Sequence, residues 1–154
     1  SENIKYGNPE ASKKKVLESA HEARMSDDIK GFPDGLKTLV GERGITLSGG
    51  QRQRTALSRA LLVDSKIIVL DDALASVDNK TASSILQSIK RQYNKTVLMI
   101  SHQLSAAAAC DRILVMNEGK IVQEGTHKFL IKKDGLYKSM WEREKAKEDL
   151  QSGY

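Results

Sequence analysis

The sequence is poor in cysteine and aromatic residues and contains no long apolar run. Its single cysteine, Cys110, excludes an internal disulfide framework and a thiolate cluster for zinc or iron–sulfur. The longest strongly apolar runs, Ile67–Leu70 and Val97–Ile100, have four residues each, whereas a bilayer-spanning helix needs about 20. Residues Ser1–Lys5 lack the basic head and apolar stretch of a signal peptide. These absences predict a chain that works on a cytosolic face and does not itself cross a membrane.

Composition and charge place the 154-residue chain among folded globular domains. Hydrophobic residues make up 39% and charged residues 29%, which excludes collagen-like, low-complexity and extensively disordered chains. The formal charge is +5, but the basic clusters are dispersed over Lys13–Lys15, Arg52, Arg54 and Lys132–Lys133. Only 5% of the residues are aromatic, so few side chains could stack on bases. We therefore expect solvated helix faces and no nucleic-acid partner.

Capping signals and glycines organise the first sixty residues into helices joined by loops. Asn8 and Pro9 predict a helix start, as N-cap and first helical residue, and this helix is expected to end near Met25. Its apolar face consists of Val16, Leu17 and Ala20. A short element at Ser26–Lys30 and a glycine-punctuated loop follow, and Ser48–Gln51 then predicts a capping box that starts another helix. The buried stripe predicted for that helix is Ala56, Leu57, Ala60 and Leu61.

From residue 67 onward, short apolar runs alternate with a helical pattern. Ile67–Leu70 and Thr96–Ile100 predict parallel strands that are covered on both faces. A helix over Asn79–Gln92 connects them, with an apolar face made of Ala82, Ile85, Leu86 and Ile89.

The remaining pattern predicts a third strand, a hairpin and a final helical region. Arg112–Met116 would complete a βαβαβ unit, and the turn Asn117–Gly119 leads into an antiparallel return at Lys120–Glu124. Thr126 can cap the last helical region. The side chains expected to pack there are Phe129, Leu130, Leu136, Tyr137, Met140 and Trp141.

Polar residues follow two of the predicted strands and begin one of the helices. Asp71 and Asp72 end the first strand, and Ser101 and His102 end the second, so these groups should line one edge of the sheet. An aspartate there can hold Mg²⁺ in a phosphate site, or it can serve as an N-cap or loop acid. His102 alone is equally compatible with an ordinary loop or core histidine. The glycine-rich start of the Ser48 helix suits an anion, although it also suits plain helix capping.

Four motifs occur in an order and spacing that point to one family. They are Leu47–Gln51, Ile67–Asp71, Ser76–Asp78 and His102. They match the signature motif, Walker B, the D-loop and the switch histidine of ATP-binding-cassette (ABC) transporters. The chain resembles the C-terminal portion of the nucleotide-binding domain of such a transporter, most closely the exporter branch. The likeness runs from Glu2–Gly7 through the Glu42-Arg43-Gly44 run to Gly125–His127.

This resemblance implies a role for each motif residue. Two such domains close head to tail, and each ATP lies between the Walker A loop of one and the signature helix of the other. Ser48 and Gly50 would contact the γ-phosphate of a nucleotide that the partner holds, with Leu47, Gly49 and Gln51 completing that motif. Asp71 would hold Mg²⁺ through water, and Asp72 would polarise the attacking water. His102 would contact the γ-phosphate, and the D-loop residues are Ser76 and Asp78.

The resemblance also implies the fold and the surroundings of the chain. The expected fold is α/β, the C-terminal part of a P-loop NTPase (ABC ATPase) domain, with a parallel sheet core and part of the helical signature subdomain. Residues 8–62 would form the helical subdomain, 63–125 the second half of the α/β core and 126–154 a C-terminal helical region. The expected partners are a second nucleotide-binding domain and the transmembrane domain of the same polypeptide, at the cytoplasmic face of a membrane.

A Walker A loop is missing from the sequence. Such a loop needs Gly, four residues and then Gly-Lys-Ser/Thr, but the pair Gly44 and Gly49 is followed by Gly50. The one Gly-Lys pair, Gly119-Lys120, lacks the first glycine. No Q-loop or adenine-stacking aromatic is recognisable either. We therefore expect a fragment that begins after the Q-loop, exposes apolar edges, and neither binds ATP and Mg²⁺ tightly nor hydrolyses ATP in isolation.

Asp72 stands where the family has a catalytic glutamate. Losing one methylene retracts the carboxylate by about 1.5 Å, and a misplacement of about 1 Å can cost on the order of 10²-fold in rate. This exchange, beside an intact signature motif, is typical of a heterodimeric exporter with one slow site. The main expectation is an ATP-hydrolysing exporter subunit. The alternatives are a regulatory half that binds but barely hydrolyses ATP, and a soluble ABC ATPase of DNA repair or translation.

Overall fold

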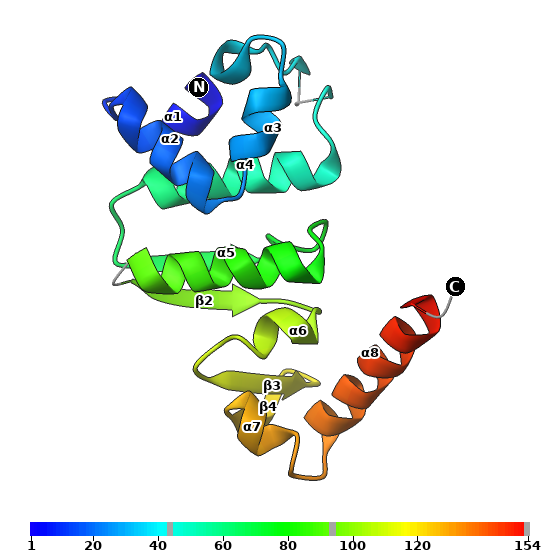
Figure 1. The fold of residues 1–154 in the computed structure, drawn as a ribbon. Coiled ribbons are helices and arrows are strands. Elements are labelled where there is room, and N and C mark those ends of the chain that lie inside the picture. Colours follow the sequence, from blue (N-terminus) through cyan, green and yellow to red (C-terminus); the bar gives the residue numbers. More distant parts are fainter. Residues whose placement is uncertain (43–44, 93–94, 153–154) are drawn as a thin grey trace. The chain divides into compact units, whose positions relative to one another are not determined.

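The chain forms two compact units, which are described separately. The structure is a computed structural model, and it describes residues 1–42, 45–92 and 95–152 (Figure 1). Arg43 and Gly44 of the Glu42-Arg43-Gly44 run therefore lie outside the described residues. One unit comprises Ser1–Ser101 and the other His102–Tyr154. Within the part of the chain that the structure describes, no helix is both long enough and apolar enough to span a bilayer.

Helices make up the first half of the Ser1–Ser101 unit. They are α1 (Glu2–Lys5), α2 (Lys13–Glu22), α3 (Ser26–Gly31), the 3-10 turn η1 (Gly35–Lys37) and α4 (Gly49–Leu62). Both α1 and α2 pack against α4, as Figure 1 shows. The core between them is apolar and contains Ile4, Val16, Ala20, Met25, Leu57 and Leu61. The structure therefore contains the helix predicted before Met25, the short element predicted at Ser26–Lys30 and the helix predicted after Ser48.

The start predicted for α2 is wrong by four residues. Ser12, not Asn8, is the N-cap, because its Oγ accepts a hydrogen bond from the Lys15 N–H at 3.3 Å. The Asn8 carbonyl instead accepts from the Ala11 N–H at 3.1 Å and closes a turn that contains Pro9. Two cap-forming residues were thus available, and the second one starts the helix. On the predicted apolar face Val16 and Ala20 are buried, whereas Leu17 is 44% exposed.

A parallel βαβ unit completes the Ser1–Ser101 unit. Strand β1 (Ile67–Asp71) leads into α5 (Asn79–Gln92), and β2 (Thr96–Ile100) returns beside β1. The two strands pair in parallel from Ile67 opposite Thr96 to Asp71 opposite Ile100. The Arg24 side chain, just after α2, donates hydrogen bonds to Ser84 Oγ at 2.6 Å and Ser88 Oγ at 3.3 Å of α5. These bonds tie the helices to the βαβ unit.

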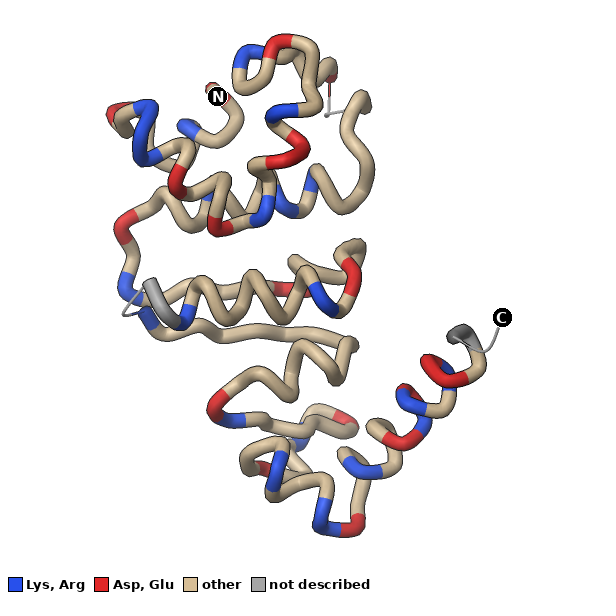
Figure 2. The backbone as a smooth tube through the Cα atoms, in the orientation of Figure 1, with Lys and Arg blue, Asp and Glu red and all other residues tan. Residues whose placement is uncertain are grey.

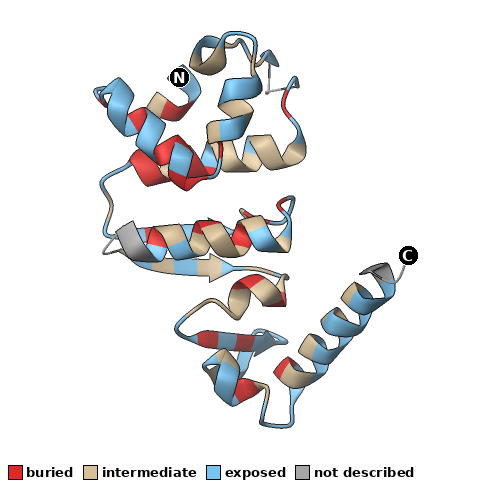
Figure 3. Ribbon diagram, in the orientation of Figure 1, coloured by how far each residue is buried: buried red, intermediate tan, exposed pale blue. Residues whose placement is uncertain are grey.

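The expectation that β1 and β2 are covered on both faces is wrong. Ile68 and Leu70 point into the core, but Ile67 and Val69 are 61% and 58% exposed. Leu98 and Ile100 of β2 are also half exposed. Exposed and less exposed residues alternate along both strands, as a one-sided sheet requires, and Figure 3 shows this as alternating pale blue and tan on β2. The apolar residues on both faces of these strands are suited to burial. The face with Ile67 and Val69, however, is not covered by any of the described residues. The predicted exposed apolar surface is confirmed.

The stripe predicted for α4 is partly corrected. Leu57 and Leu61 are buried, but Ala56 is exposed and Ala60 is only half-buried. Ser58 takes a core position instead, because its Oγ donates to the Arg54 carbonyl at 2.9 Å and so satisfies its polar group.

The His102–Tyr154 unit contains a hairpin between helices. Its elements are α6 (Leu104–Ala107), β3 (Ile113–Asn117), β4 (Lys120–Gly125), α7 (His127–Leu130) and α8 (Leu136–Ser152). The antiparallel hairpin is confirmed, and its turn has positive φ at Glu118 (48°) and Gly119 (75°), as a two-residue hairpin turn requires. The predicted βαβαβ unit is wrong, because β3 pairs within the described residues with β4 alone.

The core of this second unit is small and mixes apolar and aromatic side chains. Thr126 caps α7 as predicted, and Leu130 and Tyr137 are fully buried. The His127 Nδ1 lies 2.8 Å from the Tyr137 hydroxyl, and its ring lies 4.4 Å from that of Trp141. Three residues of the predicted core are exposed, namely Phe129, Leu136 and Met140. Leu136 and Met140 are exposed because α8 contributes only Tyr137 and Trp141 to this core, and charges of both signs follow along the rest of the helix (Figure 2).

Candidate functional site

The start of α4 carries the signature sequence and has unsatisfied donors. The Ser48 Oγ accepts from the Gln51 N–H at 3.2 Å, and the Gln51 Oε1 accepts from the Ser48 N–H at 2.9 Å. The predicted capping box is therefore formed. The N–H groups of Gly49 and Gly50, in the first turn, have no carbonyl partner within the 14-residue helix. These donors, the Ser48 hydroxyl and the helix dipole together suit an anion.

Asp28 of α3 holds the same end of α4. One of its carboxylate oxygens accepts from the Gln51 Nε2 at 3.0 Å, and the other forms a 2.6 Å ion pair with the Arg54 guanidinium. Both side chains of the ion pair are largely buried, at 16% and 19% exposure. Arg54 is thus neutralised within the chain, and Gln51 is oriented from both ends of its amide. Asp28 was not predicted from the sequence, because nothing local distinguishes it from Asp27.

The two predicted strand ends are adjacent. Asp71 lies opposite Ile100, and the Asp72 N–H donates to the Ile100 carbonyl at 3.0 Å. Asp72 has φ 44°, in the left-handed region where aspartate is tolerated better than most residues. The chain therefore turns sharply after β1. Ser101 follows Ile100 directly, whereas His102 begins the other unit.

Asp71 is the metal-ligand candidate. It is exposed at the carboxyl end of β1. Among the described residues, no three histidine, cysteine or acidic side chains gather into a cation site. A single carboxylate still fits Mg²⁺, because that ion keeps several waters and binds one or two carboxylates together with phosphate oxygens.

The segment Ser76–Asp78, predicted to be a D-loop, lies against the start of α4. The Ser76 N–H donates to the Gln53 Oε1 at 2.7 Å, and the Gln53 Nε2 donates to the Asp72 carbonyl at 3.4 Å. Asp78, the other D-loop candidate, begins α5, since its Oδ1 accepts from the Thr81 N–H at 2.9 Å. That hydrogen bond lowers the pKa of the Asp78 carboxyl. Gln53 was not predicted, because its contacts join positions about twenty residues apart.

The two signature glycines differ in what surrounds them. A Cβ on Gly50 would lie 2.9 Å from the Ser76 carbonyl oxygen, so packing within the chain requires glycine there. A Cβ on Gly49 would meet only the Ser76 side chain at 3.6 Å, an ordinary contact distance. No described part of the chain therefore requires glycine at position 49 for steric reasons. Its small size leaves room for a group from outside the chain to approach the helix backbone.

His102 belongs to the His102–Tyr154 unit. Two residues later, the Leu104 N–H donates to the Glu144 Oε2 at 3.1 Å, and the Ser105 N–H donates to the Glu144 Oε1 at 3.1 Å. The segment that follows His102 is therefore fixed by a carboxylate of α8. Glu144 was also missed, because the contact spans forty residues.

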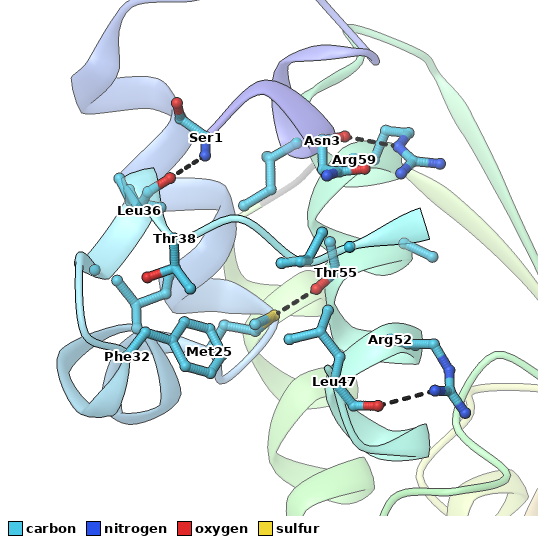
Figure 4. Close-up of a pocket in the computed structure, with 16 residues that line it drawn as sticks. Ser1, Asn3, Met25, Phe32, Leu36, Thr38, Leu47, Arg52, Thr55 and Arg59 are labelled. Atoms are coloured by element: carbon cyan, nitrogen blue, oxygen red, sulfur yellow. Dashed lines mark hydrogen bonds between the residues drawn. The ribbon is translucent and has the colours of Figure 1, made fainter. Parts of the chain in front are cut away.

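A cavity of about 360 Å³ lies beside α4 (Figure 4). Leu47 is the one signature residue in its wall, and the Leu47 carbonyl accepts from the Arg52 guanidinium at 2.8 Å. Apolar side chains from α1, α3 and η1, among them Ile4, Ile29 and Leu36, form much of the remainder. The anion-compatible groups thus lie at the helix end and not in this cavity.

Comparison with known proteins identifies relatives of the chain. A family model described as ABC transporter matches residues 3–75. The multidrug resistance-like ATP-binding protein MdlA of Buchnera aphidicola is 44% identical over 99% of this chain and 26% of its own length. The probable multidrug resistance ABC transporter ATP-binding/permease protein YheI of Bacillus subtilis is 42% identical over 93% of the chain and 25% of its own length.

A solved structure of an ABC exporter has the same fold as this chain. A bacterial Atm1-family ABC exporter with ATP bound superposes with a TM-score of 0.87 at 39% identity. The match covers 92% of this chain and 25% of that protein. The chain spans about a quarter of the length of the curated relatives it matches.

Proposed function

We propose that this chain, which belongs to the ABC transporter family as part of an exporter-type nucleotide-binding domain, contributes the signature half of an ATP site in a transport ATPase. The observation that carries this proposal is the start of α4. Its capping box holds Ser48 in place, its first-turn amides lack carbonyl partners, and Gly49 leaves space for close approach. Donors arranged in this way are complementary to phosphate oxygens.

Each motif residue then has a task in phosphoryl transfer. Ser48 and the amides of Gly49 and Gly50 donate to the γ-phosphate of a nucleotide bound by a second nucleotide-binding domain. Asp71 would hold Mg²⁺, which would neutralise charge on the phosphates, and Asp72 would orient a water molecule at the nucleotide of its own domain. His102 donates to the γ-phosphate there. When bound, MgATP supplies the phosphoanhydride, and these residues contribute positioning and charge neutralisation.

The phosphate-cradling loop must come from outside these 154 residues, because the sequence contains no Walker A motif. The half-exposed apolar face formed by Ile67, Val69, Leu98 and Ile100 supports the same view. We infer that further strands or helices of the ATPase domain cover this face. The domain division proposed from the sequence, at residues 62 and 125, is part of this proposal. The 154-residue chain alone is accordingly expected to bind MgATP weakly and to be inactive.

The whole transporter is proposed to be an exporter at the cytoplasmic face of a membrane, with a transmembrane domain in the same polypeptide. The carboxylate of Asp72 is one methylene shorter than the family's glutamate, which favours a heterodimer in which the partner supplies the faster catalytic residue opposite Ser48. A mainly regulatory, slowly hydrolysing half is the second candidate, and the same observation at Asp72 supports it.

The test is a pair of substitutions at Ser48 in the full transporter. Ser48→Asp keeps a good N-cap but places a negative charge at the proposed phosphate position, whereas Ser48→Thr keeps both the cap and the hydroxyl. We expect Ser48→Asp to lower ATP hydrolysis on the order of 10²-fold and Ser48→Thr to retain most of it. Unchanged hydrolysis in Ser48→Asp, with normal folding by circular dichroism, would overturn the proposed site.

A further inference from the structure

Gln53 joins the signature helix to the turn that follows β1. Its amide oxygen accepts from the Ser76 N–H at 2.7 Å, and its amide nitrogen donates to the Asp72 carbonyl at 3.4 Å. One side chain therefore reaches both ends of the segment 72–76. Gln53 is half-buried, so these bonds are partly shielded from water.

The segment that Gln53 reaches is a tight turn. The Ala75 N–H donates to the Asp72 carbonyl at 3.1 Å, and the Val77 N–H donates to the Leu74 carbonyl at 3.0 Å. Asp72 itself is anchored to β2 through the Ile100 carbonyl. A displacement of Ser76 is therefore transmitted to Asp72 through a short, hydrogen-bonded backbone.

The same turn also touches the signature glycines. Gln53 lies three and four positions after Gly50 and Gly49, so these residues share one face of α4. The Gly50 backbone approaches the Ser76 carbonyl so closely that a Cβ would come within 2.9 Å of it. Packing at Gly50 and hydrogen bonding at Gln53 thus fix the helix start and the D-loop to each other.

We propose that Gln53 is a positioning residue that couples the phosphate-binding end of α4 to Asp72 of the same chain. This inference rests on the proposed function, in which Ser48 and Asp72 serve two different nucleotides. A phosphate that shifts the start of α4 then moves Ser76 and Asp72 through the Gln53 amide. Because coupling between binding equilibria is reciprocal, nucleotide at the chain's own site also adjusts the signature end that faces the partner.

The chemistry requires a side chain with one acceptor and one donor. Gln53→Leu removes both bonds at similar volume. Gln53→Glu keeps an acceptor for the Ser76 N–H and loses the donor to the Asp72 carbonyl. Gln87→Ala, at an exposed position of α5, is the matched control for loss of a helical glutamine.

The contact is tested first in the 154-residue chain by amide hydrogen exchange with NMR detection. We expect the Ser76 amide to exchange about tenfold faster in Gln53→Leu, and to remain protected in Gln53→Glu and Gln87→Ala. Equal exchange rates of Ser76 in Gln53→Leu and Gln87→Ala would overturn the proposal. Exchange at buried amides such as Ile85 reports whether each variant is folded.

The coupling is tested in the full transporter by steady-state ATP hydrolysis. We expect Gln53→Leu and Gln53→Glu to lower kcat about tenfold with little change in KM for ATP, because Asp72 is displaced while nucleotide contacts persist. A kcat within twofold of Gln87→Ala would overturn the coupling. Ser48→Asp is measured in the same preparation. If it is inactive while the Gln53 variants have normal kcat, the coupling fails but the proposed function stands. If Ser48→Asp also hydrolyses ATP normally, the proposed function itself fails.

Discussion

The carboxylate of Glu144 accepts a hydrogen bond from the Leu104 N–H at 3.1 Å, and its second oxygen accepts from the Ser105 N–H at the same distance. Helix α6 has only four residues and receives no side-chain cap from its own N-cap residue, Gln103. A helix this short is not stable by itself in water. Its amino-terminal donors are satisfied instead by a side chain from α8, which makes α8 part of the structure around the segment after His102.

Glu144→Ala should loosen α6 without unfolding the hairpin. Removing the cap leaves two amide donors unsatisfied, and we expect a loss of about 1–2 kcal/mol in the local stability of α6. Amide hydrogen exchange at Leu104 and Ser105 measures this directly. Glu142→Ala, an exposed position on the same helix, is the control. Matching exchange rates in the two variants would show that Glu144 does not cap α6.

Alkaline pH should destabilise the unit that contains Tyr137. Burial raises the pKa of the Tyr137 phenol from 10.0 to about 12, with a smaller contribution from Glu144. The fold therefore favours the protonated phenol, and this contribution is present below pH 10 and is lost as the pH rises through about 12. Ultraviolet titration should show one tyrosine that ionises only near pH 12.

Tyr137→Phe is the matched variant for that titration. It removes the late-ionising phenol and the hydrogen bond with His127, and it keeps the buried ring. Unfolding between pH 10 and 12 should therefore be less steep in Tyr137→Phe. If the late ionisation persists in this variant, another tyrosine is responsible for it.

The two signature glycines should respond differently to alanine. In Gly50→Ala the new Cβ would press on the Ser76 carbonyl, and we expect a loss of about 1–3 kcal/mol in the free energy of unfolding. In Gly49→Ala the nearest atoms are at 3.6 Å, so the stability of the chain should change by less than about 0.5 kcal/mol. Urea unfolding of the 154-residue chain compares them. Equal losses would contradict the steric distinction.

Local patterns predicted the fold better than they predicted burial. The capping box at Ser48–Gln51 was predictable because all its atoms lie within one helical turn. The same reasoning failed at Asn8, where Ser12 offered a competing cap four residues later. Ile67 and Val69 have the apolarity of a covered strand, but whether a face is covered depends on other parts of the structure.

In the candidate site, too, local sequence patterns did not predict the contacts between residues far apart in the chain. The motif residues could be found from their order along the chain. Asp28, Gln53 and Glu144 hold those motifs in place, and each acts across at least nineteen residues. A side chain with such a role has no local signal in one sequence, because its partners are brought near only by the fold.

The exposed face of β1 and β2 should make the isolated chain associate. Val69 is 58% exposed and lies on the face that also carries Ile67, Leu98 and Ile100, so self-association buries apolar surface. We expect Val69→Lys to shift the chain toward monomer in analytical ultracentrifugation and to preserve its circular dichroism spectrum. Leu70→Lys, next in sequence but 3% exposed, should instead unfold the chain. Association that persists undiminished in Val69→Lys would place the contact on another surface, because a lysine at that position opposes burial of the face.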